Sequence, residues 1–230
     1  MPASSPRTRT HAVVFDCDGT LLDSMPAWHA LEADLAWMAG ITLTPQQISM
    51  LNANTLEQTV GYFHRSYGVG RSEARLLEEA RGILLEHYCT DVQPREGACE
   101  LVERLRADGV RLAVASSSPR VLLRVGLERA GVFDAFDLVA SAEDEHATKR
   151  DPAFLLSVAE RIDARPRDAW CVDDSAYALK AAKLAGFSTV GIYDSDDAGT
   201  PTQLRRTANV FVRSFAELDY WTLVGGAYAA

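Results

Sequence analysis

The sequence VVFDCDGT at residues 13–20 decides how the rest of the chain can fold. Its three leading apolar residues predict a short buried strand, and Asp16 and Asp18 follow at the carboxyl end of that strand. Because side chains alternate along an extended chain, we expect both carboxylates on one side. Gly19 lets the backbone turn tightly beside a ligand. Two carboxylates held this close repel each other, so the motif favours a bound divalent cation.

Two other interpretations of this motif compete with a metal site. A turn rich in Asp and Gly is common and needs no ligand. A calcium loop that starts at Asp16 would need an acidic or amide ligand at its fifth position, Gly at its sixth and Glu at its twelfth. Thr20, Leu21 and Ala27 hold those positions, so the sequence excludes the calcium loop and leaves the simple turn open.

Around this motif, short runs rich in β-branched residues alternate with amphipathic helical patterns. We expect strands at residues 11–15, 111–116, 137–141, 169–173 and 188–193, and a weaker one at 209–212. Such an alternation is typical of an α/β fold with a parallel, Rossmann-like sheet.

A long insert separates the first two expected strands. The gap from residue 15 to residue 111 is far longer than one crossover needs, and its pattern is helical. Helix starts are expected after Pro26, at the capping boxes of Thr44 and Thr55, and at Ser72. We therefore predict an α/β core of residues 1–21 and 93–230 and a helical cap domain of residues 22–92.

Serines and a lysine follow later strands. Residues 116–118 are serines at the end of a strand, where hydroxyls and free N–H groups at a helix start can bind phosphate. A simple N-cap before Pro119 is the alternative. Lys149 precedes a helix that Asp151 and Pro152 begin. A lysine at this place can neutralise charge on a phosphoryl group, whereas most isolated lysines lie in solvent.

A second pair of acids, Asp173 and Asp174, ends the fourth expected strand, and a helix starts at Ser175. Acids at a helix start can simply complement the helix dipole. Beside the first acid pair, however, they offer the carboxylate oxygens that Mg²⁺ prefers.

Together these elements resemble the four motifs of the haloacid dehalogenase superfamily. The motifs are DxDGT at residues 16–20, a hydrophobic strand ending in Ser116, Lys149 followed by xxP, and a strand followed by Asp173-Asp174-Ser175. The insert resembles the helical cap that one subgroup carries after its first motif. The match keeps order and spacing over roughly residues 11–215.

The resemblance implies roles for the matching residues. Asp16 would attack phosphorus to form an aspartyl-phosphate, while Asp18 would protonate the leaving oxygen and then activate water. The implied catalytic residues are Asp16, Asp18, Ser116 and Lys149, and the implied phosphate-binding residues are Gly19, Thr20, Ser116, Ser117 and Lys149. The implied Mg²⁺ ligands are the Asp16 and Asp174 carboxylates and the Asp18 carbonyl, with Asp173 helping directly or through water.

The resemblance also implies a magnesium-dependent phosphatase for a small sugar or polyol phosphate. A β-phosphoglucomutase-like sugar phosphomutase is the alternative, and a catalytically idle binding protein is a third class. Such mutases carry His where Trp28 aligns and Arg where Leu56 aligns, which favours the phosphatase, although Arg65, Arg71 and Arg75 further along the insert could take the place of that Arg. Cap residues that we expect near the substrate are Trp28, His29, Asn52 and Asn54.

Composition limits the partners. The 230-residue chain is 47% apolar with a formal net charge of -9, which argues against nucleic-acid or anionic-membrane surfaces. No apolar run reaches membrane-spanning length, the N-terminal residues lack a secretory h-region, and the four cysteines show no CxxC spacing. We therefore expect a cytoplasmic enzyme that binds a small phosphorylated metabolite, and the sequence does not predict its oligomeric state.

Overall fold

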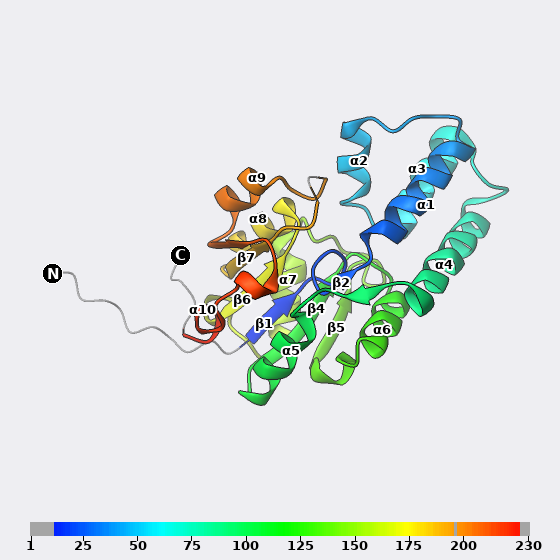
Figure 1. The fold of residues 1–230 in the computed structure, drawn as a ribbon. Helices are drawn as coiled ribbons and strands as arrows, with labels where there is room; N and C mark the ends of the chain where they lie inside the picture. Colours follow the sequence, from blue (N-terminus) through cyan, green and yellow to red (C-terminus); the bar gives the residue numbers. More distant parts are fainter. Residues whose placement is uncertain (1–11, 196, 226–230) are drawn as a thin grey trace.

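The computed structural model describes residues 12–195 and 197–225 and shows an α/β core built on a parallel sheet (Figure 1). The strand order is β5-β4-β1-β6-β7-β8. The strands are β1 (Ala12–Phe15), β4 (Arg111–Ser116), β5 (Leu138–Ser141), β6 (Ala169–Asp173), β7 (Ser188–Ile192) and β8 (Val210–Val212). The predicted parallel α/β fold is confirmed, with β5, β7 and β8 each one residue shorter than expected. His11, at the start of the first expected strand, lies outside the described residues.

Helices cover both faces of this sheet because its strands are apolar on both sides. In β1, Val13 and Phe15 face one apolar cluster and Ala12 and Val14 face the other. The first cluster includes side chains of α5 (Ala98–Ala107), α6 (Arg120–Arg129) and α10 (Tyr220–Val224). The second includes side chains of α7 (Pro152–Arg161) and α8 (Ala176–Leu184), and α9 (Pro201–Thr207) contacts β7 and β8. Short 3₁₀ helices lie at Phe133–Ala135, Pro166–Asp168 and Phe215–Glu217.

The central position of β1 decides where a ligand can bind. This strand pairs in parallel with β4 on one side and β6 on the other, and Phe15 is in register with Val114 and Val172. The chain segments that follow these three strands therefore meet at one edge of the sheet. Open α/β sheets bind ligands at this kind of edge, next to the strand where the order reverses.

The predicted insert between β1 and β4 contains four helices: α1 (Met25–Met38), α2 (Pro45–Leu51), α3 (Leu56–Tyr67) and α4 (Glu73–Thr90). The capping boxes predicted at Thr44 and Thr55 are confirmed, and the Ser72 side chain caps α4. Among the described residues, no helix combines the length and apolar character that a membrane crossing requires.

A two-stranded antiparallel sheet joins the two ends of the insert. Its strands are β2 (Leu22–Asp23) and β3 (Gln93–Pro94), and Leu22 pairs with Pro94. The chain therefore leaves the core and returns to it at neighbouring points. The domain boundaries at residues 22 and 92 stay a prediction.

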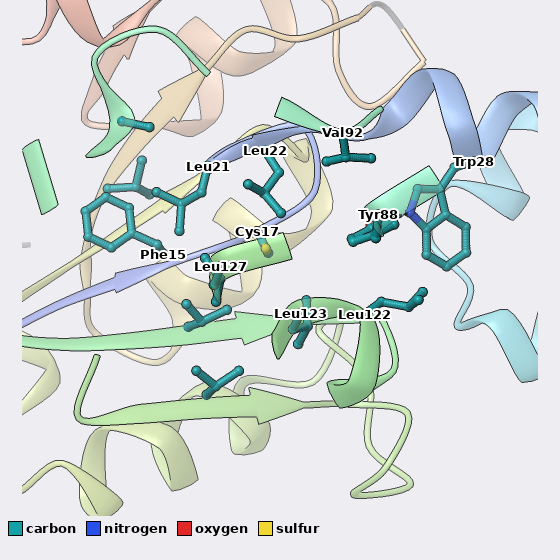
Figure 2. Packing of buried hydrophobic residues seen from close by; sticks show 14 of the residues in the cluster. Phe15, Cys17, Leu21, Leu22, Trp28, Tyr88, Val92, Leu122, Leu123 and Leu127 are labelled. Atoms are coloured by element: carbon teal, nitrogen blue, oxygen red, sulfur yellow. Dashed lines mark hydrogen bonds between the residues drawn. The ribbon is translucent and has the colours of Figure 1, made fainter. Parts of the chain in front are cut away.

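The base of the insert packs directly on the core. Figure 2 shows Leu22 and Tyr88 in the apolar cluster that runs from Phe15 in the sheet to Trp28 on α1. Gly126 on α6 makes this packing possible, because a Cβ there would come within 2.5 Å of Leu22 Cδ1 and 3.1 Å of Tyr88 Cδ1. The contact between insert and core thus depends on a position without a side chain.

A polar contact joins the insert to the core at a second place. The buried Glu143, which follows β5, accepts a hydrogen bond of 2.9 Å from the backbone N–H of Glu57 at the start of α3. Its other carboxylate oxygen lies 3.5 Å from the guanidinium of Arg81 on α4. The insert therefore rests on the core through both apolar and charged contacts.

Candidate active site

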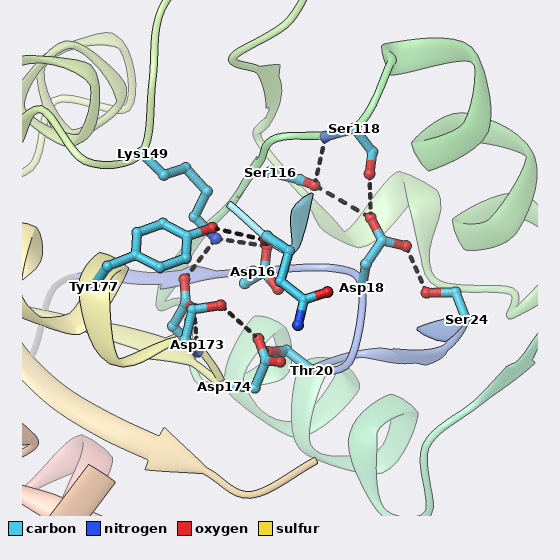
Figure 3. A network of polar contacts seen from close by, with 12 residues as sticks. Asp16, Asp18, Thr20, Ser24, Ser116, Ser118, Lys149, Asp173, Asp174 and Tyr177 are labelled. Atoms are coloured by element: carbon cyan, nitrogen blue, oxygen red, sulfur yellow. Dashed lines mark hydrogen bonds and ion pairs between the residues drawn. The ribbon is translucent and has the colours of Figure 1, made fainter. Parts of the chain in front are cut away.

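Asp16 lies at the centre of a buried charge cluster at the end of β1 (Figure 3). The Nζ atom of Lys149 is 2.6 Å from Asp16 Oδ1 and 2.5 Å from Asp173 Oδ2. Burial disfavours the ammonium form, but the two carboxylates outweigh this and raise the pKa of Lys149 well above its usual value. The lysine is therefore a fixed positive charge at the Asp16 carboxylate, contributed by the loop before α7.

Three carboxylates lie together here, and Lys149 forms ion pairs with two of them, Asp16 and Asp173. One oxygen from each of Asp16, Asp173 and Asp174 lies within 4.8 Å of the other two. Burial raises the pKa of Asp16 to about 7, since Lys149 offsets only part of the penalty. Burial, followed by the charges of Asp16 and Asp173, also raises the pKa of Asp174 well above its usual range. An oxygen-rich, negatively charged cluster of this kind fits a divalent cation.

Gly19 allows the first motif to approach this cluster. Its φ of +76° is left-handed, and a Cβ there would lie 2.7 Å from Asp174 Oδ2. Thr20 follows, with its Oγ1 at 3.5 Å from Asp174 Oδ1. Arg95, next to β3, donates hydrogen bonds to the Gly19 carbonyl and, at 2.8 Å, to the Tyr193 carbonyl. The loop that carries the predicted nucleophile is thus held from several sides.

Asp18 has a different environment although it is only two residues from Asp16. Its Oδ1 accepts hydrogen bonds from the hydroxyls of Tyr88 and Ser24, the latter at 2.6 Å. Its Oδ2 accepts from Ser118 Oγ at 2.6 Å and Ser116 Oγ at 3.3 Å. Figure 3 shows this carboxylate turned toward the serines and away from Asp173 and Asp174. Hydroxyls that donate to a carboxylate hold it in one orientation.

The side chain of Asp18 is accordingly not part of the acid cluster found among the described residues. A metal contact through the Asp18 backbone carbonyl stays a prediction, as do the roles of the other predicted ligands.

One pocket with an empty volume of about 520 Å³ brings the predicted core residues together with the insert. From the core it is lined by Asp16, Asp18, Ser116, Ser117, Lys149 and Asp174. From the insert it is lined by Trp28, Glu32, Leu51, Asn52 and Asn54. His29 is not among the lining residues, because it lies one position further round α1 than Trp28.

Sequence reasoning missed Tyr88, Ser24, Ser118 and Glu32. Tyr88 lies in the apolar stripe of α4, and its hydroxyl also accepts a 3.0 Å hydrogen bond from Trp28 Nε1. Ser118 was named only as part of a phosphate site, yet it contacts Asp18. Glu32 follows Trp28 by four residues, so a carboxylate on the apolar stripe of α1 was a visible signal.

Comparisons with known proteins identify the family. The model of the haloacid dehalogenase-like hydrolase family matches residues 10–186. Hexitol phosphatase B of Escherichia coli O157:H7 is 28% identical over 233 residues, covering 96% of this chain and 100% of the relative. A phosphoglycolate phosphatase of Nitrosospira multiformis is 31% identical over 187 residues, covering 76% of this chain and 79% of the relative.

A solved structure shows the same fold. The β-phosphoglucomutase from Clostridium difficile superposes with a TM-score of 0.76 at 19% identity, covering 91% of this chain and 93% of that one. At this identity the likeness concerns the fold alone. The predicted resemblance is confirmed by the family match, which covers most of the chain: the protein belongs to the haloacid dehalogenase-like hydrolases and is, like these curated relatives, a phosphatase.

Proposed function

We propose that the protein is a magnesium-dependent phosphatase that releases phosphate from a small sugar or polyol phosphate through an aspartyl-phosphate on Asp16. One observation carries the proposal. A buried carboxylate, Asp16, is paired with Lys149 beside two further acids, while Asp18 faces the same pocket from a separate, hydroxyl-lined position. This arrangement separates a nucleophile from an acid–base group.

In the first step, an oxygen of Asp16 attacks phosphorus and the bond from phosphorus to the leaving oxygen breaks. Asp18 gives its proton to that leaving oxygen. In the second step, a water gives a proton to Asp18 and attacks phosphorus, which breaks the bond to Asp16. Hydrogen bonds from Ser24 and Ser118 keep the Asp18 carboxyl in place for both transfers.

Charge neutralisation decides whether the first step can occur, since a carboxylate must approach an anionic phosphoryl group. Lys149 supplies one positive charge at Asp16. The carboxylates of Asp16, Asp173 and Asp174 would hold Mg²⁺, which supplies further positive charge when bound. Ser116 and Ser117 line the same pocket and would donate hydrogen bonds to phosphoryl oxygens.

The phosphomutase alternative needs a cation for the second phosphate of a bisphosphate intermediate. Leu56, at the aligned cap position, is fully buried. Arg65 is paired with Glu73, and Arg75 with Glu78 and Glu79, on the exposed surface of the insert. Among the described residues that line the pocket, Lys149 is the one cation. These observations support the phosphatase.

The test is turnover of an aryl phosphate with Mg²⁺ by the wild-type protein and by Asp16→Asn. We expect Asp16→Asn to lose activity by roughly four orders of magnitude or more, as variants that lack a nucleophile do. Acid-quenched wild-type enzyme should carry one phosphoryl group on Asp16, seen by mass spectrometry of peptides. Full activity in excess chelator, or undiminished hydrolysis by Asp16→Asn at wild-type melting temperature, would overturn the proposal.

A further inference from the structure

Glu32 is a buried carboxylate that the chemistry proposed above does not use. It lies on α1 one turn after Trp28, is 5% exposed and lines the pocket that contains Asp16 and Asp18. Within the described parts of the chain, no side chain or backbone group donates a hydrogen bond to it or forms an ion pair with it. Burial, followed by the charge of Asp197, raises its pKa to about 7. Burying such a group without a partner is unfavourable, so stability alone does not explain it.

Asn52 adds a second unsatisfied side chain to the same pocket. It lies at the carboxyl end of α2, and both its amide nitrogen and its amide oxygen are buried without a partner among the residues described. Nearly all buried polar groups in proteins form hydrogen bonds, and those that do not often await a ligand or water. Two neighbouring elements of the insert thus present unsatisfied polar groups to one pocket.

The chemistry of these groups selects among substrates. A carboxylate accepts hydrogen bonds, and an amide both donates and accepts. Hydroxyl groups can satisfy both, since each hydroxyl is a donor and an acceptor. A second anionic group on the substrate would instead face Glu32. The one lining cation, Lys149, is already held between Asp16 and Asp173.

A further cation lies outside this pocket. Arg150 lines an adjoining hollow together with Asn52 and Asp197, and its guanidinium stacks over the Tyr177 ring at 4.6 Å. The charge that acts on Glu32 is that of Asp197, which disfavours its carboxylate form. A short acid such as phosphoglycolate, bound with its phosphate at Asp16, would therefore place its carboxylate in a pocket that Glu32 lines and Arg150 does not.

We propose that Glu32 and Asn52 form a substrate subsite that binds the hydroxyl groups of a neutral polyol tail and that Glu32 disfavours substrates with an anionic tail. The proposal rests on the phosphatase function above and names the residues that decide its substrate class. Glu32 acts on binding and selection, whereas Asp16 and Asp18 act on the reacting bonds.

The test compares kcat/KM for a hexitol 6-phosphate and for phosphoglycolate in the wild type, Glu32→Gln and Asp34→Asn. Asp34 is an exposed acid on the same helix and is the matched control. We expect the wild type to prefer the hexitol phosphate. Glu32→Gln should lower that preference by about tenfold or more, the size expected for hydrogen bonds to a charged group, whereas Asp34→Asn should keep it. A preference within twofold of wild type in Glu32→Gln, or a wild-type preference for phosphoglycolate, would overturn the subsite.

A binding measurement separates this outcome from failure of the phosphatase function. Calorimetry on an Asp16→Asn background gives the Kd of phosphoglycolate divided by the Kd of uncleaved hexitol 6-phosphate, a ratio that needs no turnover. We expect Glu32→Gln and, separately, Asn52→Ala to lower that ratio about tenfold. An unchanged ratio in both variants would refute the subsite whether or not the wild-type enzyme hydrolyses either compound.

Discussion

The core side and the insert side of the pocket differ in how their polar groups are satisfied. On the core side, Lys149 lies between Asp16 and Asp173. Both carboxylate oxygens of Asp18 accept hydrogen bonds from hydroxyl groups. On the insert side, the side-chain amide of Asn52 is buried without a hydrogen-bond partner among the described residues, and none of these residues donates a hydrogen bond to the 5% exposed Glu32. Under the proposed function, this difference is a division of work: groups that would act on the phosphoryl bond are held in place before substrate arrives, whereas groups that would select the substrate are left for it to satisfy.

Of the variants that test this comparison beyond Asp16→Asn, removing Asp18 should give the largest effect. For Asp18→Ala we expect kcat/KM to fall about 10²- to 10⁴-fold with an alkyl phosphate, the range of general acid–base catalysis. An aryl phosphate should lose less, because its leaving oxygen is less basic and needs less protonation. Steady-state kinetics with both substrates measures this difference. Equal losses would show that Asp18 does not protonate the leaving group.

The pH dependence of stability should reveal the energetic cost of burying the Glu32 carboxylate. Its pKa rises from 4.5 to about 7 on folding, so the folded protein holds a proton that the unfolded chain has lost between these pH values. The wild type should therefore lose stability as pH rises through this window, by about 3 kcal/mol in all. The Gln side chain does not titrate. We therefore expect the free energy of unfolding of Glu32→Gln to rise relative to that of the wild type between pH 5 and pH 8.

Denaturant unfolding at those two pH values measures the gain. Asp34→Asn, which changes an exposed acid of the same helix, should show no such pH-dependent difference. If Glu32→Gln differed from the wild type by the same amount at both pH values, the carboxylate would not be the source of the penalty.

The contact between insert and core can be tested at Gly126. A methyl group there would meet Leu22 and Tyr88, so Gly126→Ala should lower the free energy of unfolding by about 1–3 kcal/mol, as overpacking does. Gly82 on α4 is the matched control, because a Cβ at that helical position meets nothing within 4 Å. Gly82→Ala should stabilise the protein by up to about 1 kcal/mol. Equal changes in the two variants would contradict the close packing at Gly126.

The smallest expected effect comes from one hydroxyl that joins the two sides. Tyr88 belongs to the insert, yet its hydroxyl donates to Asp18 and accepts from Trp28 Nε1. For Tyr88→Phe we expect kcat with an alkyl phosphate to fall about tenfold, the size of one lost hydrogen bond to a charged group. KM should change little, because the hydroxyl acts through Asp18. Tyr67→Phe, on the surface of α3, is the control, and a loss confined to KM would contradict the positioning role.

The sequence was sufficient to predict the strands, the helix caps and the grouping of acids, because each depends on local patterns or on where parallel strands end. Asp16, Lys149 and Asp174 were located in this way. The partners of Asp18 were not, since Ser24, Tyr88 and Ser118 come from three segments whose approach depends on how the insert packs. The carboxylate of Glu32 was visible on the stripe of Trp28, but only the burial of that face shows that it lies inside the pocket.

The pairing of β2 with β3 has a consequence for protein engineering. Because Leu22 lies opposite Pro94, the segment between them enters and leaves the core at neighbouring points. A chain of almost any length can close such a short gap at little entropic expense, since the expense grows only slowly with length. This junction is therefore the natural splice point for grafting a different insert onto the same catalytic sheet. A successful graft would have to rebuild the packing on Gly126, the hydroxyls at Asp18 and the polar contacts of Glu143 with the insert.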